Sequence, residues 1–333
     1  MNPIVGVVRA SGAPEGGGAP EARATRPVVI TGASGFLGRH LLAHYLGRGR
    51  DVIALTRDRR RLDDLSHAHL RVQEVDYGGA IDLPPSSTII YCASMRNAPK
   101  PSPHSFTRAN VTEPLNVATR GRAQRFIHLG TALVLGSSIT PLDDSAPLAP
   151  SNDPYIRSKH DAITALETSG VPLITILPSI IYGPDSPRSP NRITSHMRRL
   201  LSKKLRFGVQ TPPRNLVFVN DVVRAIVQAE EHGVLGAHYL VAGDNVTMAA
   251  FEDEVFAAAG KRPTPRIRVP KSFVTASGQL IDRVLGYDAS SGWTARARTL
   301  LAPWCFRMVR ARNELAVEPT PLAAGVQRTL AAL

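Results

Sequence analysis

Tyr155 and Lys159 could move a proton together, because they stand four residues apart in a segment of helical character. At that spacing the phenol and the ammonium lie one turn apart on the same helix face. The ammonium would stabilise the phenolate and so lower a pKa that is about 10 in unperturbed tyrosine. The phenol could then donate a proton to a carbonyl oxygen, or accept one from an alcohol, as a hydride moves. An ordinary pair on a solvated helix would share this spacing, so other residues must support the assignment.

Thr131 carries a hydroxyl that could hold the same substrate oxygen. It directly follows the apolar run Arg125–Gly130, which has the length and composition of a buried strand. A side chain at the carboxyl end of a parallel strand lies where the ligands of such sheets bind. Thr131 therefore adds a second polar group to the expected site.

The stretch Pro27–Leu46 joins a strand to a helix through three glycines. Val28–Ile30 is long enough for a buried parallel strand, and apolar residues at helical spacing follow the glycines. Gly32 allows a tight turn, Gly35 lets backbone N–H groups approach a pyrophosphate, and Gly38 lets the helix pack close to the strand. The first N–H groups of the helix can then bind phosphate oxygens. Together these features predict a dinucleotide-binding loop, with a glycine-rich turn of an ordinary α/β unit as the alternative.

The end of the next predicted strand, Asp51–Thr56, bears on which dinucleotide binds. An acidic side chain at this point would hold the 2′-hydroxyl of NAD and repel a 2′-phosphate. Here Arg57 follows the strand, with Arg59–Arg61 close behind, and a guanidinium suits a phosphate monoester. The sequence thus favours NADP(H) over NAD. Asp58 leaves NAD possible. The alternative explanation for these arginines is that they only cover a helix start.

Short apolar runs alternate with helical patterns up to about residue 180. This alternation predicts a Rossmann-type α/β fold, a doubly wound parallel sheet with helices on both faces. The further predicted strands are Leu70–Val75, Ser87–Cys92, Arg125–Gly130, Val171–Leu177 and, around a helix at Val222–Glu231, Asn215–Asp221 and His238–Ala242.

The chain divides into a predicted nucleotide-binding domain, residues 27–181 and 215–243, and a smaller substrate-binding lid, residues 182–214 and 244–333. The lid is expected over the carboxyl ends of the strands. The Pro-rich linker Pro141–Pro154 is predicted as a surface loop that leads into a helix near its end. Pro114 should start or kink its own helix. Residues 1–26, rich in Gly, Ala, Pro and Glu, predict a disordered leader.

The net charge of +13 could suggest a nucleic-acid partner, but its make-up argues against one, and no nucleic acid is expected to bind. Arginines are scattered along the chain, and aromatic residues that could stack on bases make up only 5% of it. The charge is interpreted as a solvated surface that locally attracts phosphates. The distant Cys92 and Cys305 make no metal-ligand pattern, and no apolar run is long enough to span a bilayer. With no secretion signal, a cytoplasmic location is expected.

In their order along the chain, these features resemble those of the extended short-chain dehydrogenase/reductase family, also called the NAD-dependent epimerase/dehydratase family. The resemblance covers about residues 27–330. The family's elements are a glycine signature, an acidic residue that contacts adenine, an Ala-rich turn, an Asn-Val helix start, a catalytic Ser or Thr, a Tyr-Lys pair, a loop beside the nicotinamide and a domain-crossing motif. The counterparts here are Thr31–Gly38, Asp76, Cys92–Ser94, Asn110–Val111, Thr131, Tyr155 with Lys159, Pro178–Pro184 and Phe218–Asp221.

The resemblance implies roles for the matching residues. The implied catalytic residues are Thr131, Tyr155, Lys159 and Asn110, with the phenol as acid/base, the ammonium lowering its pKa and holding the ribose, and the carboxamide supporting them. The implied cofactor-binding residues are Gly32, Ser34, Gly35, Phe36, Leu37, Gly38, Arg57, Asp76, Tyr77, Ala93, Ser94, Lys159, Pro178 and Ile181. Arg214 falls where nucleotide-sugar members bind the diphosphate, so the implied substrate contacts are Thr131, Tyr155 and Arg214.

Departures from the family pattern narrow the expected reaction. The family's 4,6-dehydratases have Asp-Glu directly after the active-site Thr, whereas Ala132 and Leu133 follow it here, which argues against dehydration. Leu177 replaces an Arg and Leu135 a Tyr that are common in the family, which loosens the link to nucleotide sugars. The segment Arg266–Gly286 is more similar to the branch with hydroxysteroid dehydrogenases and dihydroflavonol reductase-like enzymes.

The expected activity is hydride transfer between NADP(H), or secondarily NAD, and a carbonyl or secondary alcohol of a small organic substrate. A nucleotide-sugar epimerase with retained NAD(P) is the second expectation, and a non-catalytic NAD(P)-binding protein is the third. The expected partners are the small-molecule substrate and, from the dimers common in the resembling family, a second copy of the chain. No metal is expected. The substrate itself stays open, because the loops of such a lid carry no fixed signature.

Overall fold

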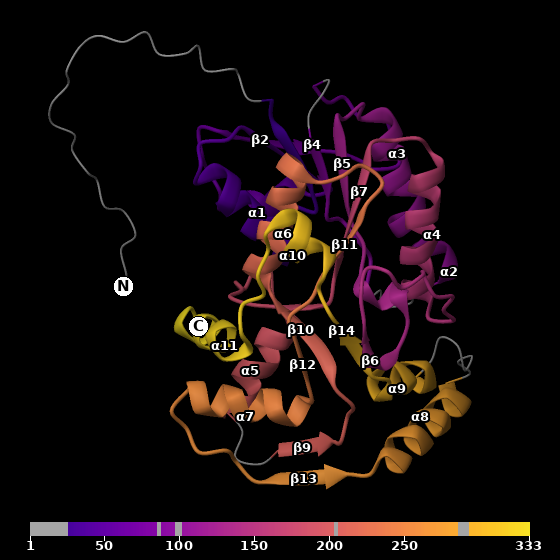
Figure 1. Cartoon of the computed structure of the whole chain (residues 1–333), viewed down its shortest axis with the longest axis vertical. Coiled ribbons are helices and arrows are strands. Elements are labelled where there is room, and N and C mark those ends of the chain that lie inside the picture. Colours follow the sequence, from indigo (N-terminus) through magenta and orange to yellow (C-terminus); the bar gives the residue numbers. More distant parts are fainter. Residues whose placement is uncertain (1–25, 85–87, 97–101, 203–205, 286–292) are drawn as a thin grey trace, which may run out of the picture.

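A computed structural model of the chain describes residues 26–84, 88–96, 102–202, 206–285 and 293–333. The predicted leader lies outside these residues except for Arg26, and so does Ser87, the first residue of a predicted strand. In the described part, a large sheet with helices on both faces adjoins a smaller region of strands and helices (Figure 1). Across those ranges no helix combines the length and the apolar character needed to cross a membrane.

The large sheet has seven strands in the order β11-β7-β5-β4-β1-β2-β3. Their bounds are β1 Val28–Thr31, β2 Val52–Thr56, β3 Leu70–Glu74, β4 Thr88–Tyr91, β5 Arg125–Leu129, β7 Leu173–Pro178 and β11 His238–Val241. All neighbouring strands are parallel, so the prediction of a doubly wound parallel sheet is confirmed. The chain moves outward from β1 to β3 and then returns to β4 on the other side of β1. The carboxyl ends of β1 and β4 therefore meet at the switch point where such sheets bind ligands.

Helices bury both faces of this sheet, which explains its continuous apolar strands. One face carries α1 (Phe36–Leu46), α6 (Val219–His232) and α10 (Arg310–Leu315), and the other carries α2 (Pro103–Thr107), α3 (Glu113–Arg120) and α4 (Pro154–Thr168) (Figure 1). Val28 packs in the same core cluster as Leu41 of α1, whereas the next residue, Val29, packs with Val117 of α3. The period of two along β1 thus divides its side chains between two cores.

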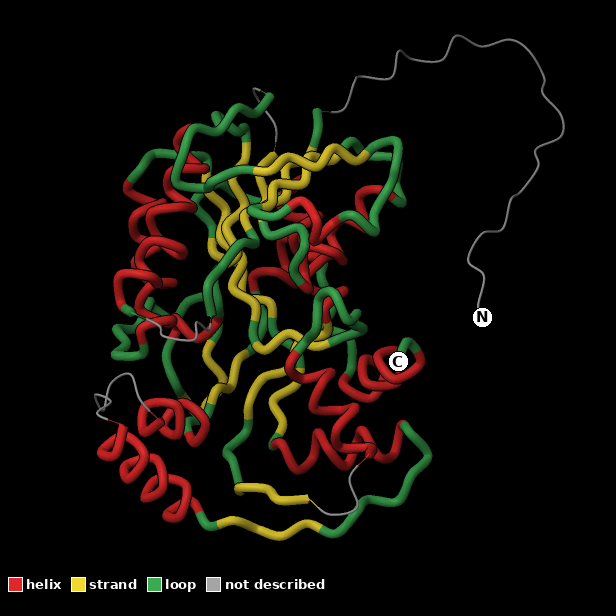
Figure 2. Tube along the Cα trace, turned by 180° about the vertical axis from the view of Figure 1, so that it is seen from behind, coloured by secondary structure: helices red, strands yellow, loops and turns green. Residues whose placement is uncertain are grey.

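The smaller region is built on a second sheet in the order β12-β10-β14-β6, with β8 pairing to β10. Its strands are β6 Ser138–Leu142, β8 Ile180–Tyr182, β10 Arg214–Phe218, β12 Asp244–Val246 and β14 Trp304–Phe306. Helices α5 (Arg192–Ser202), α7 (Met248–Ala258), α8 (Lys271–Leu285), α9 (Trp293–Leu301) and α11 (Leu322–Ala331) surround it. The two-stranded sheet of β9 (Arg206–Val209) and β13 (Arg266–Val269) lies at the far end of the molecule from the parallel sheet (Figure 2).

One predicted strand, Asn215–Asp221, is three residues too long. Strand β10 ends at Phe218, and Val219 already begins α6. Asp221 explains the change, because its buried carboxylate lies in the first turn of α6, where a negative charge stabilises a helix, and accepts bonds from the N–H (2.8 Å) and hydroxyl (2.6 Å) of Thr320. Strand β10 also belongs to the second sheet, although its residues fall in the predicted nucleotide-binding domain. The division into two domains stays a prediction.

The predicted surface loop Pro141–Pro154 also differs at its start, since Pro141 and Leu142 are the last residues of β6. The loop is then held in place by Asp144, whose carboxylate accepts the N–H groups of Leu240 and Arg310, the latter at 2.9 Å. Both proline predictions for helix starts are confirmed, because Pro114 and Pro154 each occupy the first turn of a helix.

Candidate active site

The glycine turn after β1 leaves no room for side chains at two of its three glycines. Gly32 has a φ of +64°, and a Cβ there would lie 2.7 Å from the backbone nitrogen of Ala93. A Cβ on Gly38 would lie 2.7 Å from the Cα of Ala33. Gly35 is the N-cap of α1, and no described side chain caps this helix end or places an acid in its first turn. The first N–H groups of α1 are therefore open to an anion, which fits a dinucleotide pyrophosphate.

Ser34, Phe36 and Leu37 complete this turn. Ser34 and Leu37 are buried, and the ring of Phe36 lies 5.1 Å from that of His40. Thr31, at the end of β1, ties the turn to β4, because its hydroxyl accepts the N–H groups of Cys92 (3.1 Å) and Ala93 (3.2 Å). The ends of β1 and β4 are thereby held together at the switch point.

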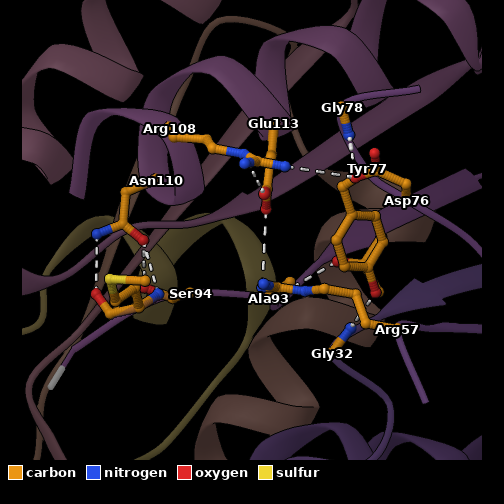
Figure 3. Close-up of polar contacts among 12 residues, drawn as sticks. Gly32, Arg57, Asp76, Tyr77, Gly78, Ala93, Ser94, Arg108, Asn110 and Glu113 are labelled. Carbon is orange, nitrogen blue, oxygen red and sulfur yellow. Dashed lines mark hydrogen bonds and ion pairs between the residues drawn. The ribbon is translucent and has the colours of Figure 1, made fainter. Parts of the chain in front are cut away.

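At the carboxyl end of β2, the side chain of Arg57 lies against both Tyr77 and Glu113 (Figure 3). The Arg57 guanidinium lies 5.5 Å from the centre of the Tyr77 ring, and its Nη2 lies 3.7 Å from Oε2 of Glu113. The Tyr77 hydroxyl donates to the carbonyl of Leu55 at 2.8 Å and accepts the N–H of Gly32 at 3.3 Å. Tyr77 therefore connects the glycine turn to the residue expected to choose the cofactor.

The charges around Arg57 leave it available to a ligand. Its side chain is 52% exposed, while that of Glu113 is only 4% exposed. Burial raises the pKa of Glu113, and Arg57 and Arg108 oppose that rise by stabilising the carboxylate. Burial also raises the pKa of Tyr77 to about 12, so this phenol stays neutral. Two cavities, of about 740 Å³ on the Arg57 side and about 390 Å³ on the Glu113 side, open beside the pair.

Asp58 is turned toward Arg60 rather than toward Arg57. Its carboxylate accepts the N–H of Arg60 at 3.1 Å and pairs with the Arg60 guanidinium at 3.0 Å, which caps the short helical turn Arg59–Leu62. Arg59–Arg61, which follow Asp58, therefore fit the alternative given above, that these arginines only cover a helix start. Arg57 itself lies before that turn.

Asp76 lies on the rim of the smaller cavity, with 67% of its side chain exposed and Oδ1 at 3.9 Å from Nη2 of Arg108. Its carboxylate also accepts the N–H of Gly78 at 3.1 Å. Asn116 of α3 holds this turn by donating to the carbonyls of Tyr77 (2.8 Å) and Gly79 (2.9 Å). Asp76 is thus exposed at the edge expected to receive the adenine.

Asn110 is buried and joins the loop after β4 to α4 (Figure 3). Its carboxamide oxygen accepts the N–H of Met95 (2.8 Å) and the hydroxyl of Ser94 (3.1 Å). Its amide donates to the carbonyl of Met95 (2.9 Å) and to Oγ of Ser158 (2.9 Å). Asn110 was predicted to be catalytic or to support the catalytic residues, and these contacts favour the supporting role.

Tyr155 and Thr131 face each other where β5 ends and α4 begins. Tyr155 follows Asp153, whose carboxylate caps α4 by accepting the N–H of Tyr155 at 2.9 Å. Burial raises the pKa of the Tyr155 phenol, while Arg96 and a hydrogen bond with the Thr131 hydroxyl act in the opposite direction. The two polar groups that the sequence placed far apart are therefore neighbours.

Lys159 is buried and points toward the sheet, where its Nζ donates to the carbonyl of Leu129 at 2.8 Å. Burial lowers the pKa of this ammonium to about 8. The cation that stabilises the Tyr155 phenolate here is instead Arg96, whose guanidinium lies 5.9 Å from the centre of the Tyr155 ring. Sequence reasoning missed Arg96, although a basic residue three positions after Ala93 in the loop following a central strand was a usable signal.

The predicted substrate residue Arg214 begins β10 and is directed toward α9. Its Nη2 donates to the carbonyl of Thr299 at 2.7 Å, and the Thr299 hydroxyl lies 3.4 Å from the Asp153 carboxylate. Pro178 ends β7, and Ile181 lies in β8 opposite Val217 of β10. Pro178 and Ile181 therefore lie where the chain passes from the parallel sheet to the second sheet.

Burial raises the pKa of the Cys92 thiol to about 12, which makes it a poor nucleophile. In the described ranges, no group of three or more His, Cys, Asp or Glu residues is placed to hold a metal ion.

Comparisons with known proteins identify the family. The NAD dependent epimerase/dehydratase family matches residues 28–242. The chain is 27% identical over 297 residues to dTDP-4-keto-6-deoxy-D-glucose reductase of Streptomyces niveus, covering 85% of this chain and 95% of that relative. It is 24% identical over 281 residues to tetraketide alpha-pyrone reductase 1 of Arabidopsis thaliana, covering 74% of this chain and 83% of the relative.

A comparison with solved structures supports the same fold. The crystal structure of dTDP-glucose 4,6-dehydratase from Bacillus anthracis str. Ames in complex with NAD superposes with a TM-score of 0.69 at 18% identity, covering 92% of this chain and 96% of that one. The resemblance stated from the sequence motifs is confirmed, and the chain belongs to the NAD dependent epimerase/dehydratase family.

Proposed function

We propose that this protein is an NADP(H)-dependent oxidoreductase that interconverts a carbonyl and a secondary alcohol, with Tyr155 as the acid/base. The observation that carries the proposal is the contact between the Tyr155 phenol and the Thr131 hydroxyl beside the switch point of the parallel sheet. Two hydroxyls at this place can bind one substrate oxygen. The uncapped start of α1 supports a dinucleotide at the same edge.

A bound nicotinamide cofactor would supply the hydride for the carbonyl carbon or accept it from the alcohol carbon. The Tyr155 phenol donates its proton to the carbonyl oxygen during reduction and takes it back during oxidation. Thr131 donates a hydrogen bond to the same oxygen and so stabilises the negative charge that develops there. Lys159, with a pKa of about 8, carries a positive charge beneath the site at neutral pH.

Arg57 supports NADP(H) over NAD as the preferred cofactor. Its exposed guanidinium approaches Glu113 no closer than 3.7 Å, so its N–H groups can still bind a 2′-phosphate. Asp58, which could have held a ribose hydroxyl, pairs with Arg60 instead. The similar dehydratase structure in complex with NAD keeps NAD as the second choice.

A nucleotide-sugar substrate is the second candidate, because one relative is a dTDP-4-keto-6-deoxy-D-glucose reductase. An epimerase that retains its cofactor would use Tyr155 twice, as the base when the substrate carbon is oxidised and as the acid when it is reduced again. The role of Arg214 in binding a diphosphate stays a prediction, and its Nη2 donates to the Thr299 carbonyl. The homodimer and the cytoplasmic location stay predictions.

The proposal is tested by adding NADPH and a panel of carbonyl compounds to the purified protein and following NADPH absorbance. A reductase consumes NADPH in proportion to the alcohol formed. An epimerase would instead show no net NADPH consumption. It would keep its cofactor through purification and would interconvert sugar isomers. If the protein binds the cofactor but turns over neither the carbonyl compounds nor the sugar isomers, it is a binding protein without catalytic activity.

A further inference from the structure

Arg96 is placed where a substrate would meet the catalytic residues. It belongs to the loop after β4, its guanidinium lies 5.9 Å from the centre of the Tyr155 ring, and the residue is exposed. The distance is that of a cation–π contact, which holds the charge over the ring while its N–H groups stay open to a ligand. Tyr155 is half-buried, so part of this residue is also accessible.

This guanidinium has no carboxylate partner among the residues that the structure describes. Other arginines near the expected cofactor site do have one, since Arg57 and Arg108 both approach Glu113 at 3.7 Å. The stretch around Arg96, residues 83–112, contains Arg96, Lys100 and Arg108 but no Asp or Glu. An uncompensated cation beside a catalytic phenol attracts an anion.

The backbone of Met95, which directly precedes Arg96, is held in place relative to Tyr155. Asn110 accepts the N–H of Met95 at 2.8 Å and donates to the Met95 carbonyl at 2.9 Å, so both polar groups of the preceding residue are held. The same carboxamide donates to Ser158 of α4, three residues after Tyr155. The backbone next to Arg96 is therefore held before any ligand arrives, which reduces the entropy lost on binding.

We propose that Arg96 binds an anionic group, a carboxylate or a phosphate-type oxyanion, that the substrate carries next to its reacting carbonyl carbon. This inference rests on the proposed function and names the substrate class as oxo acids or the corresponding hydroxy acids. A guanidinium binds such an oxyanion through two parallel hydrogen bonds, which also orients the neighbouring carbonyl toward Tyr155 and Thr131. Neutral ketones of the same shape lack this contact and are poorer substrates.

Matched pairs of probes test this directly. Benzoylformate and benzoylacetate are compared with their methyl esters, and benzoylphosphonate supplies the phosphate-type anion. In the wild type, at least one anion should have a kcat/KM about 10- to 100-fold above its neutral ester, expressed mainly in KM. Arg96→Met should reduce that ratio to near one, and Arg96→Lys should restore part of it. The ratio isolates binding, because a change in the pKa of Tyr155 would affect acid and ester alike.

Arg157→Met is the matched control. Arg157 is an exposed arginine of α4 whose guanidinium contacts Ser151 and Asn152, so its loss removes one positive charge near Tyr155 without touching Arg96. This variant should keep the preference for the anion. Equal kcat/KM values for acids and esters in the wild type, or an unchanged preference in Arg96→Met, would overturn the inference.

A binding measurement separates this inference from the proposed function. Titration calorimetry of benzoylformate and benzoylphosphonate into NADP⁺-saturated protein needs no turnover. Anion binding that Arg96→Met weakens about 10-fold or more supports the inference even if no carbonyl is reduced. Reduction of neutral ketones together with no Arg96-dependent anion binding supports the function and refutes the anion site.

Discussion

The side-chain amide of Asn110 donates a hydrogen bond to Oγ of Ser158 at 2.9 Å, and this contact links the loop after β4 to the helix that carries Tyr155 and Lys159. Ser158 in turn donates to the carbonyl of Tyr155 at 2.8 Å. The relative position of Arg96 and Tyr155 therefore depends on one buried carboxamide.

Asn110→Ala should loosen this arrangement. The substitution removes four hydrogen bonds of the carboxamide, to Ser94, to Met95 twice and to Ser158, which should lower the free energy of unfolding by about 2–3 kcal/mol. The kcat/KM for carbonyl reduction should fall about 10- to 100-fold, because a small displacement of positioned groups is costly in catalysis. Asn116→Ala, compared at saturating NADPH because its turn adjoins the expected adenine contact Asp76, is the control, since it removes two carboxamide hydrogen bonds of similar kind. Equal losses of kcat/KM in both variants would contradict the special role of Asn110.

Tyr155→Phe should abolish turnover while leaving the Kd for NADPH within about 3-fold of wild type, because only the proton donor is removed. Stopped assays at high protein concentration measure the residual rate, and fluorescence titration measures NADPH binding. Turnover at the wild-type rate would refute the acid/base assignment of Tyr155. Loss of NADPH binding would show that the phenol serves the cofactor rather than the substrate.

Arg57→Ala should weaken the binding of NADPH about 10- to 100-fold and the binding of NADH less than about 3-fold. The reason is that a charged hydrogen bond to the 2′-phosphate is lost only for NADPH. Arg59→Ala, in the helical turn that follows, should change neither affinity appreciably. The two Kd values are measured by titration for each variant. Parallel losses for NADPH and NADH in Arg57→Ala would mean that this residue does not read the phosphate.

Lys159→Met should make the protein more stable at neutral pH. Burial lowers the pKa of Lys159 to about 8, whereas the unfolded chain has a value of about 10.4. Between these values the unfolded chain binds more protons, so the free energy of unfolding of the wild type rises with pH. Below pH 8 the full cost of burying the ammonium is present. After subtracting its hydrogen bond to Leu129, the variant should gain about 2 kcal/mol at pH 7.

Denaturant unfolding at pH 7, 8.5 and 10 measures this difference, which should shrink toward the highest pH. Lys261→Met serves as the control, because Lys261 is exposed. A difference that stays constant with pH would mean that the Lys159 ammonium is not destabilised by burial.

Much of the fold was predictable because its signals are local. The apolar runs of β1, β2, β4, β5 and β7 sit in a sheet buried on both faces, so each strand could be recognised without knowing its neighbours. The errors fell where a distant residue decided the outcome. Val219 became helical with Asp221 held by Thr320, and Pro141 became part of a strand by pairing of β6 with β14.

The sequence by itself determined the glycine turn, the proline helix starts and the spacing of Tyr155 and Lys159, because each depends on backbone geometry within a few residues. It also determined membership of the family, since several short motifs occur in one order. Only the tertiary structure decided that Arg96 lies over Tyr155 and that Lys159 donates to the carbonyl of Leu129. The direction of a long charged side chain depends on which partners and how much water surround it, and those are set by segments far away in the chain.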